Sequence, residues 1–71
     1  MRAQLDRKKL KEIREQNNLT QEQLAELSDI SDRYLRNLET IDTNPSAGVL
    51  CRISRVLDVT MDELMVIKID S

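Results

Sequence analysis

One pattern that recurs four times along the chain constrains its fold more than any other feature. An apolar residue is followed by Ser or Thr, and a Leu stands four positions after the hydroxyl residue. Such a hydroxyl accepts a hydrogen bond from a free backbone N–H of a helix's first turn, and the residue before it packs on the fourth helical residue. Each occurrence therefore predicts a helix start. The four sets are Leu19-Thr20 with Leu24, Ile30-Ser31 with Leu35, Pro45-Ser46 with Leu50, and Val59-Thr60 with Leu64.

An earlier helix is expected before Thr20. Its apolar stripe consists of Leu5, Leu10 and Ile13, and Asn17-Asn18 is suited to a left-handed stop. Because the apolar residues recur at helical spacing, the sequence predicts an all-α fold, a compact five-helix bundle. The expected helices cover about residues 5–17, 21–28, 32–40, 47–57 and 61–66.

The clearest short connection lies between the second and third expected helices, at Ser28-Asp29-Ile30. A turn of three or four residues between two helices is typical of a helix-turn-helix, which commonly has Gly in the turn. Asp29 is acceptable there, because Asp enters the left-handed region more readily than most residues. We therefore expect a helix-turn-helix formed by helices two and three.

Composition excludes several functional classes. The chain has 71 residues, no His and one Cys, which argues against zinc sites built on these residues and rules out an intrachain disulfide. The small core expected at this length argues against an internal active site, so we expect no enzyme, catalytic residue, metal or cofactor. The longest apolar run, residues 64–67, is too short for a membrane span, and a cytoplasmic protein is expected. A net charge of −2 is not that of a general polyanion binder.

The third expected helix, residues 32–40, carries a polar stripe opposite Leu35 and Leu38. The stripe has i, i+3, i+4, i+7 spacing and holds no acidic residue. Arg suits the two acceptors of guanine or a phosphate, and Asn suits the acceptor–donor pair of adenine. The alternative is an ordinary solvated face. The stripe consists of Arg33, Arg36, Asn37 and Thr40.

Two residues at helix starts can extend this surface. Gln21, in the first turn of the second helix, presents an amide beside free backbone N–H groups, a suitable clamp for a phosphate. Asp32 can accept from the amino group of cytosine, or it can merely favour the helix dipole. The sequence leaves both roles of Asp32 open.

A resemblance to a known family rests on LKEIREQNNLTQEQLAELSDISDRYLRNLE, followed by NPS and LCRISRVLDVTMDEL. These segments resemble the Cro and phage-repressor helix-turn-helix family, the xenobiotic-response-element type, without a gap over residues 10–64. The resemblance implies a lambda-repressor-like DNA-binding domain whose recognition helix, about 32–40, enters the major groove of double-stranded operator DNA. The DNA contacts that it implies are Gln21, Asp32, Arg33, Arg36, Asn37, Thr40, Thr43 and Asn44.

The resemblance also implies a structural ion pair between Arg14 and Glu39; the alternative is two independent surface charges. The chain departs from the family pattern at Thr40-Ile41, where Arg-Gly or Asn-Gly is frequent, and in the usually basic loop that follows. Residues 31–44 hold two Arg against three acidic residues, a local charge of −1. We therefore expect a low affinity for DNA per monomer, because phosphate neutralisation supplies much of it.

We divide the chain into a helix-turn-helix domain, residues 1–66, and a tail, residues 67–71. Residues 65–70 alternate in character and are rich in β-branched side chains, and a lone strand is not stable. Either Ile67 and Ile69 fold back onto the core, or the tail meets a second chain. A two-fold homodimer would match palindromic half-sites.

Together these observations predict a transcriptional regulator, a repressor that binds a palindromic operator as a homodimer. We expect no membrane association and no small-molecule ligand. One alternative, motivated by the acidic balance, is a protein-interaction module that keeps the helix-turn-helix scaffold with weak or no DNA binding. Another is the DNA-binding domain of a longer regulator.

Overall fold

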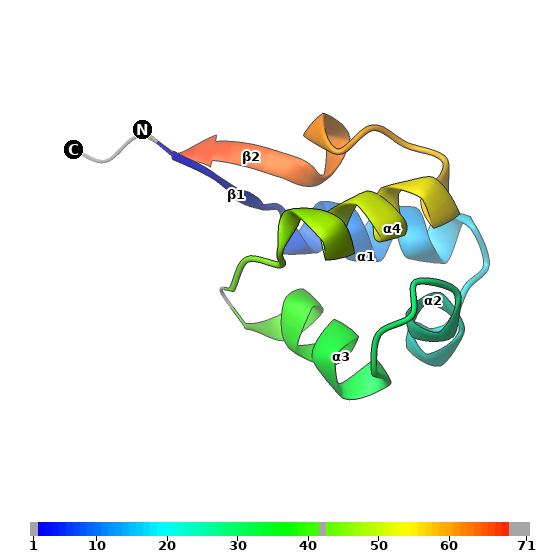
Figure 1. The fold of residues 1–71 in the computed structure, drawn as a ribbon. Helices are drawn as coiled ribbons and strands as arrows, with labels where there is room; N and C mark the ends of the chain where they lie inside the picture. The colour runs from blue at the N-terminus through cyan, green and yellow to red at the C-terminus, as the bar shows by residue number, and fades with distance from the viewer. Residues whose placement is uncertain (1, 42, 69–71) are drawn as a thin grey trace.

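The computed structural model describes residues 2–41 and 43–68. Figure 1 shows α2 and α3 on one side, the strands β1 and β2 on the opposite side, and α1 and α4 between them. Within the described residues no helix combines the length and the apolarity needed to cross a bilayer. In chain order, the elements are β1 (Arg2–Leu5), α1 (Arg7–Gln16), α2 (Gln21–Leu27), α3 (Asp32–Thr40), α4 (Ala47–Leu57), the 3₁₀ turn η1 (Asp62–Leu64) and β2 (Met65–Lys68).

The four hydroxyl caps predicted from the sequence are confirmed. Each accepts a hydrogen bond from the backbone N–H three residues further on, which holds the first turn of the element that follows. The backbone N–H groups of Thr20 and Thr60 also donate to the side chains of Gln23 and Glu63, which completes two capping boxes. The cap distances are 3.0 Å at Thr20, 3.0 Å at Ser31, 3.3 Å at Ser46 and 3.3 Å at Thr60.

The expectation of an all-α, five-helix bundle is wrong at both ends of the chain. The first helix begins at Arg7 instead of residue 5, because the Asp6 carboxylate caps it by accepting from the backbone N–H of Lys9 at 3.1 Å. In place of the fifth helix stands only η1. The backbone becomes extended at Met65, with φ −114° and ψ 152°, and continues into β2. The β-branched residues there favour a strand over a further helical turn.

The C-terminal segment folds back along its own chain as far as Lys68. There β2 pairs with β1 in antiparallel register, with Leu5 opposite Met65 and Ala3 opposite Ile67. The expected boundary between the domain and its tail, between residues 66 and 67, falls inside this strand. Ile69, which was expected either to fold back onto the core or to meet a second chain, lies outside the described residues. The Ile67 side chain remains 64% exposed.

The core is aliphatic and takes at least one side chain from β1, each α-helix and η1. Leu35 and Leu38 of α3 are fully buried, so the opposite side of that helix is turned outward. The stops predicted at Asn18 and Asp29 are confirmed as left-handed residues, with φ of 58° and 57°. The core consists of Leu5, Leu10, Ile13, Leu24, Ala25, Leu35, Leu38, Leu50, Ile53, Leu57 and Leu64.

Removal of the caps tests their contribution. We expect Thr20→Ala to lower the free energy of unfolding by ~1 kcal/mol, and Thr60→Ala by ~0.5 kcal/mol, because Thr60 begins only a short 3₁₀ turn. Urea denaturation measures both effects as shifts in the midpoint. Thr20→Ser, which keeps the hydroxyl, is the matched control. Midpoints equal to wild type in both alanine variants would contradict a stabilising role of the hydroxyls.

Candidate nucleic-acid interface

A short turn joins α2 to α3 and confirms the predicted helix-turn-helix. The backbone N–H of Ser28 still donates to Leu24, at 2.9 Å, and the left-handed Asp29 then reverses the chain. The N–H of Ile30 donates to the carbonyl of Ala25 at 3.0 Å, and the Ile30 side chain packs against the core. The turn is therefore anchored on both sides and fixes the position of α3 relative to α2.

The outward side of α3 carries the stripe identified in the sequence. Arg33, Arg36 and Thr40 are exposed and Asn37 is half-buried. In the part of the chain that the structure describes, the side chains of Arg33, Arg36 and Asn37 make no hydrogen bond or ion pair, so their donors face outward unused. The Thr40 hydroxyl instead donates to the carbonyl of Arg36 at 2.7 Å. Asp32 lies exposed in the first turn of the same helix.

Glu39 points inward from α3, where the carboxylate is bound by Arg14 of α1. Arg14 Nε donates to Glu39 Oε2 at 2.7 Å and Arg14 Nη2 to Glu39 Oε1 at 3.0 Å; the two side chains are only 9% and 1% exposed. The remaining guanidinium nitrogen, Nη1, donates to the carbonyl of Leu19 at 2.8 Å. Arg14 therefore ties α1 to α3 and to the segment that leads into α2.

Gln21 stands at the start of α2, as expected, but its side chain is directed inward. Its Nε2 donates to Glu39 Oε1 at 3.1 Å, so the amide joins the buried ion pair. An amide nitrogen has two N–H donors, and one bond to Glu39 leaves the second for a phosphate. In the isolated protein Gln21 thus links α2 to α3.

The connection between α3 and α4 is fastened to β1. Asn44 Oδ1 accepts from the backbone N–H of Leu5 at 2.8 Å, and the N–H of Thr43 donates to the carbonyl of Ile41 at 2.8 Å. Thr43 is half-buried and Asn44 is exposed. Both residues follow shortly after the end of α3 in the chain. Asp42, which precedes Thr43, lies outside the described residues.

Two arginines that the sequence reasoning did not assign bind carbonyls at the C-terminal ends of α2 and α3. Arg7 Nη1, from α1, donates to the carbonyl of Thr40 at 2.9 Å, and Arg52 Nε, from α4, donates to the carbonyl of Ser28 at 2.9 Å. Cations at the C-terminal carbonyls of helices are stabilising. The sequence contains the cations but no pattern that says which helix end each one reaches.

Comparison with known proteins agrees with this geometry. Residues 10–64 match the family model described as Helix-turn-helix. A putative HTH-type transcriptional regulatory protein of Methanococcus vannielii is 40% identical over 57 residues, which are 80% of this chain. The chain spans only 17% of the length of that relative.

Solved structures give the same result in three dimensions. The restriction-modification controller protein C.AhdI of Aeromonas hydrophila superposes with a TM-score of 0.77 and 31% identity, over 82% of this chain and 88% of that one. SinR, a master regulator for biofilm formation from Bacillus subtilis, was solved in complex with DNA. That structure superposes with a TM-score of 0.77 and 32% identity, over 82% of this chain and 94% of the chain in that structure.

The fold and the stripe on α3 thus define a helix-turn-helix domain. The chain belongs to the helix-turn-helix family, in its Cro and phage-repressor branch, as the sequence motifs indicated.

Proposed function

We propose that this protein is a sequence-specific DNA-binding transcriptional regulator that reads its operator through α3. The observation that carries the proposal is the outward stripe. Arg33, Arg36 and Asn37 lie on the side of α3 opposite the buried Leu35 and Leu38, and no described residue uses their donors. The DNA complex of SinR, which is 32% identical to this chain, supports the same reading.

On this proposal α3 lies in the major groove. Arg33 and Arg36 donate to guanine O6 and N7 or to a phosphate, and Asn37 donates to N7 and accepts from N6 of adenine. Gln21 directs its second N–H to a phosphate from the start of α2, a contact that positions the domain without reading sequence. The proposed contacts of the remaining residues are a cytosine amino group for Asp32, and phosphates for Thr40, Thr43 and Asn44.

We further propose that the protein acts as a homodimer on a palindromic operator and represses transcription by occupying it. Residues 31–44 have a local charge of −1, so one copy neutralises few phosphates and two copies bound together gain affinity. The exposed Ile67 on β2 offers apolar surface to a second chain. The tail beyond residue 66 is the proposed dimer contact.

Titration of the intact protein against DNA tests the function. We expect fragments from beside its own gene that contain an inverted repeat to bind more tightly than random DNA, with binding weakened between about 50 mM and 200 mM salt. Fluorescence anisotropy measures the affinity. Sedimentation of the saturated complex measures the stoichiometry, expected to be two chains per operator. If the folded protein binds none of these fragments in a salt-sensitive way, the proposal fails.

A second candidate function is a protein-interaction module on the same scaffold. It is favoured by the net charge of −2 and by the internal bonds of Gln21 and Asn44, which engage side chains that the family resemblance assigns to DNA. The same titration separates the two functions, since this candidate predicts no salt-sensitive binding to DNA. A third reading, the DNA-binding domain of a longer regulator, agrees with the 17% coverage of the Methanococcus vannielii relative.

A further inference from the structure

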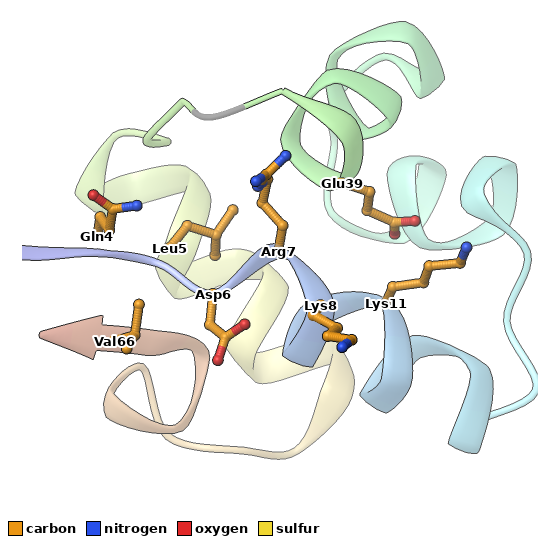
Figure 2. Close-up of a pocket in the computed structure, with 8 residues that line it drawn as sticks. All are labelled: Gln4, Leu5, Asp6, Arg7, Lys8, Lys11, Glu39 and Val66. Carbon is orange, nitrogen blue, oxygen red and sulfur yellow. The ribbon is translucent and has the colours of Figure 1, made fainter. Parts of the chain in front are cut away.

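A pocket of about 450 Å³ opens where β1 runs into α1, beside α3. Three cations from the first turns of α1 line it: Arg7, Lys8 and Lys11. Figure 2 shows Arg7 pointing from α1 toward α3, Lys11 pointing from α1 to the side on which Glu39 reaches down from α3, and Lys8 pointing away from α3. The pocket therefore presents positive charge next to the proposed reading helix.

The acidic groups that line the pocket already have partners. The Asp6 carboxylate accepts from the backbone N–H of Lys9, and Glu39 is held by the bidentate Arg14 and by Gln21. Across residues 2–41 and 43–68, by contrast, Lys8 and Lys11 form no ion pair. The charge that the pocket can offer to an incoming group is thus positive.

The position of the pocket links it to the end of α3. Arg7 lines the pocket and at the same time donates to the carbonyl of Thr40, the last residue of that helix. Arg7, Lys11 and Arg14 follow each other at i, i+4, i+7 spacing, so they share the side of α1 that faces α3. Arg7 and Lys11 therefore lie beside Glu39 and Thr40, at the C-terminal end of α3.

We propose that this pocket binds one phosphodiester group of the DNA backbone, outside the contacts made by α3. The inference rests on the proposed function. Arg7 and Lys11 donate to the non-bridging oxygens of that phosphate, while Lys8 adds longer-range attraction. These donors compensate for the local charge of −1 in residues 31–44. Inorganic phosphate has the same chemistry, and the experiment distinguishes the two sources.

The test compares two double variants of equal charge. One carries Lys8→Gln and Lys11→Gln; the matched control carries Lys9→Gln and Arg55→Gln, which remove two exposed cations that do not line the pocket. We expect the slope of log affinity against log salt to become shallower by about 0.9 in the pocket variant, the value for one lost phosphate contact. The slope of the control should stay that of wild type. The loss should be equal on operator and random DNA, since backbone contacts carry no sequence information.

Each other outcome overturns a defined part of the idea. If both double variants lose slope equally, the effect is one of overall charge and the pocket is not a site; if neither does, DNA does not use the pocket. Wild-type protein that binds no DNA instead refutes the proposed function itself. In a parallel NMR titration of wild type with inorganic phosphate, the amide shifts of residues 7, 8 and 11 are followed. If these shifts saturate and the phosphate does not weaken DNA binding, the pocket is a site for a free anion instead of DNA. Equal thermal midpoints show that the variants are folded.

Discussion

Replacing Arg14 by Met is expected to lower the free energy of unfolding by ~3–5 kcal/mol, because it strands a buried carboxylate. Glu39 is 1% exposed and would keep only the hydrogen bond from Gln21. Replacing Arg14 by Met together with Glu39 by Leu removes both charges, and the double variant should be more stable than the single one. The double variant should still be less stable than wild type, since the carbonyl of Leu19 loses the hydrogen bond from Arg14. Urea denaturation of the three proteins measures the order.

Arg55→Met, which removes an exposed cation from α4, is the matched control and should change stability by less than about 0.5 kcal/mol. A domain of this size has little stability in reserve, so the single variant is best measured at low temperature with the double variant beside it. The single variant Glu39→Leu completes a double-mutant cycle, and additive effects of the two substitutions in that cycle would show that the pair contributes no coupling energy, against the geometry of the structure.

The second large effect is expected in DNA binding. Asn37→Ala should cost ~1–3 kcal/mol on the preferred operator, because a bidentate contact to a base is lost. The variant should lose its sequence preference at only one base pair, expected to be an A·T pair, and should bind operators that differ at that base pair about equally. Gln21→Ala should instead weaken binding to all sequences about equally. Anisotropy titrations against the operator and its single base-pair variants measure both patterns; an equal loss on every fragment for Asn37→Ala would show that this residue reads no base.

The variant Asp32→Asn distinguishes the two roles left open for Asp32 and is measured in the same titrations. If its carboxylate accepts from a cytosine amino group, Asp32→Asn lowers the preference for the operator over random DNA. If the carboxylate only repels phosphates, the same change strengthens binding to every fragment. Because Asn and Asp are nearly equal in size, the change in charge and in hydrogen bonding accounts for the difference.

How much could be predicted from the sequence depended on how far apart in the chain the partners lie. The cap at Thr20 involves a residue three positions away, so its spacing alone predicted the bond. The pairing of β1 with β2 joins Ala3 to Ile67 across almost the whole chain, and the four residues of β1 include no β-branched or aromatic side chain that would favour a strand. Leu5 fitted the expected helix stripe equally well, which led to a first helix that began too early.

The site shows the same limit. The outward stripe follows from helical spacing once Leu35 and Leu38 are placed inside, and the structure has them inside. The hydrogen bond from Gln21 to Glu39, 18 residues away, has no local signature and was not expected from the sequence, whereas the phosphate contact of Gln21 stays a prediction. Arg7 binds a backbone carbonyl, a group that every residue has, so no choice of side chain in the sequence marks its partner.

The three arginines that hold the helix-turn-helix, Arg7, Arg14 and Arg52, have a consequence for how such regulators diversify. They fix α3 through Glu39 and through backbone carbonyls at the ends of the two helices, and none of these bonds uses a side chain of the outward stripe. Substitutions at Arg33 or Asn37 therefore leave the scaffold intact. On the proposed function, one copy of a duplicated gene can therefore change the DNA sequence it prefers, one stripe residue at a time, and keep every bond that these arginines make.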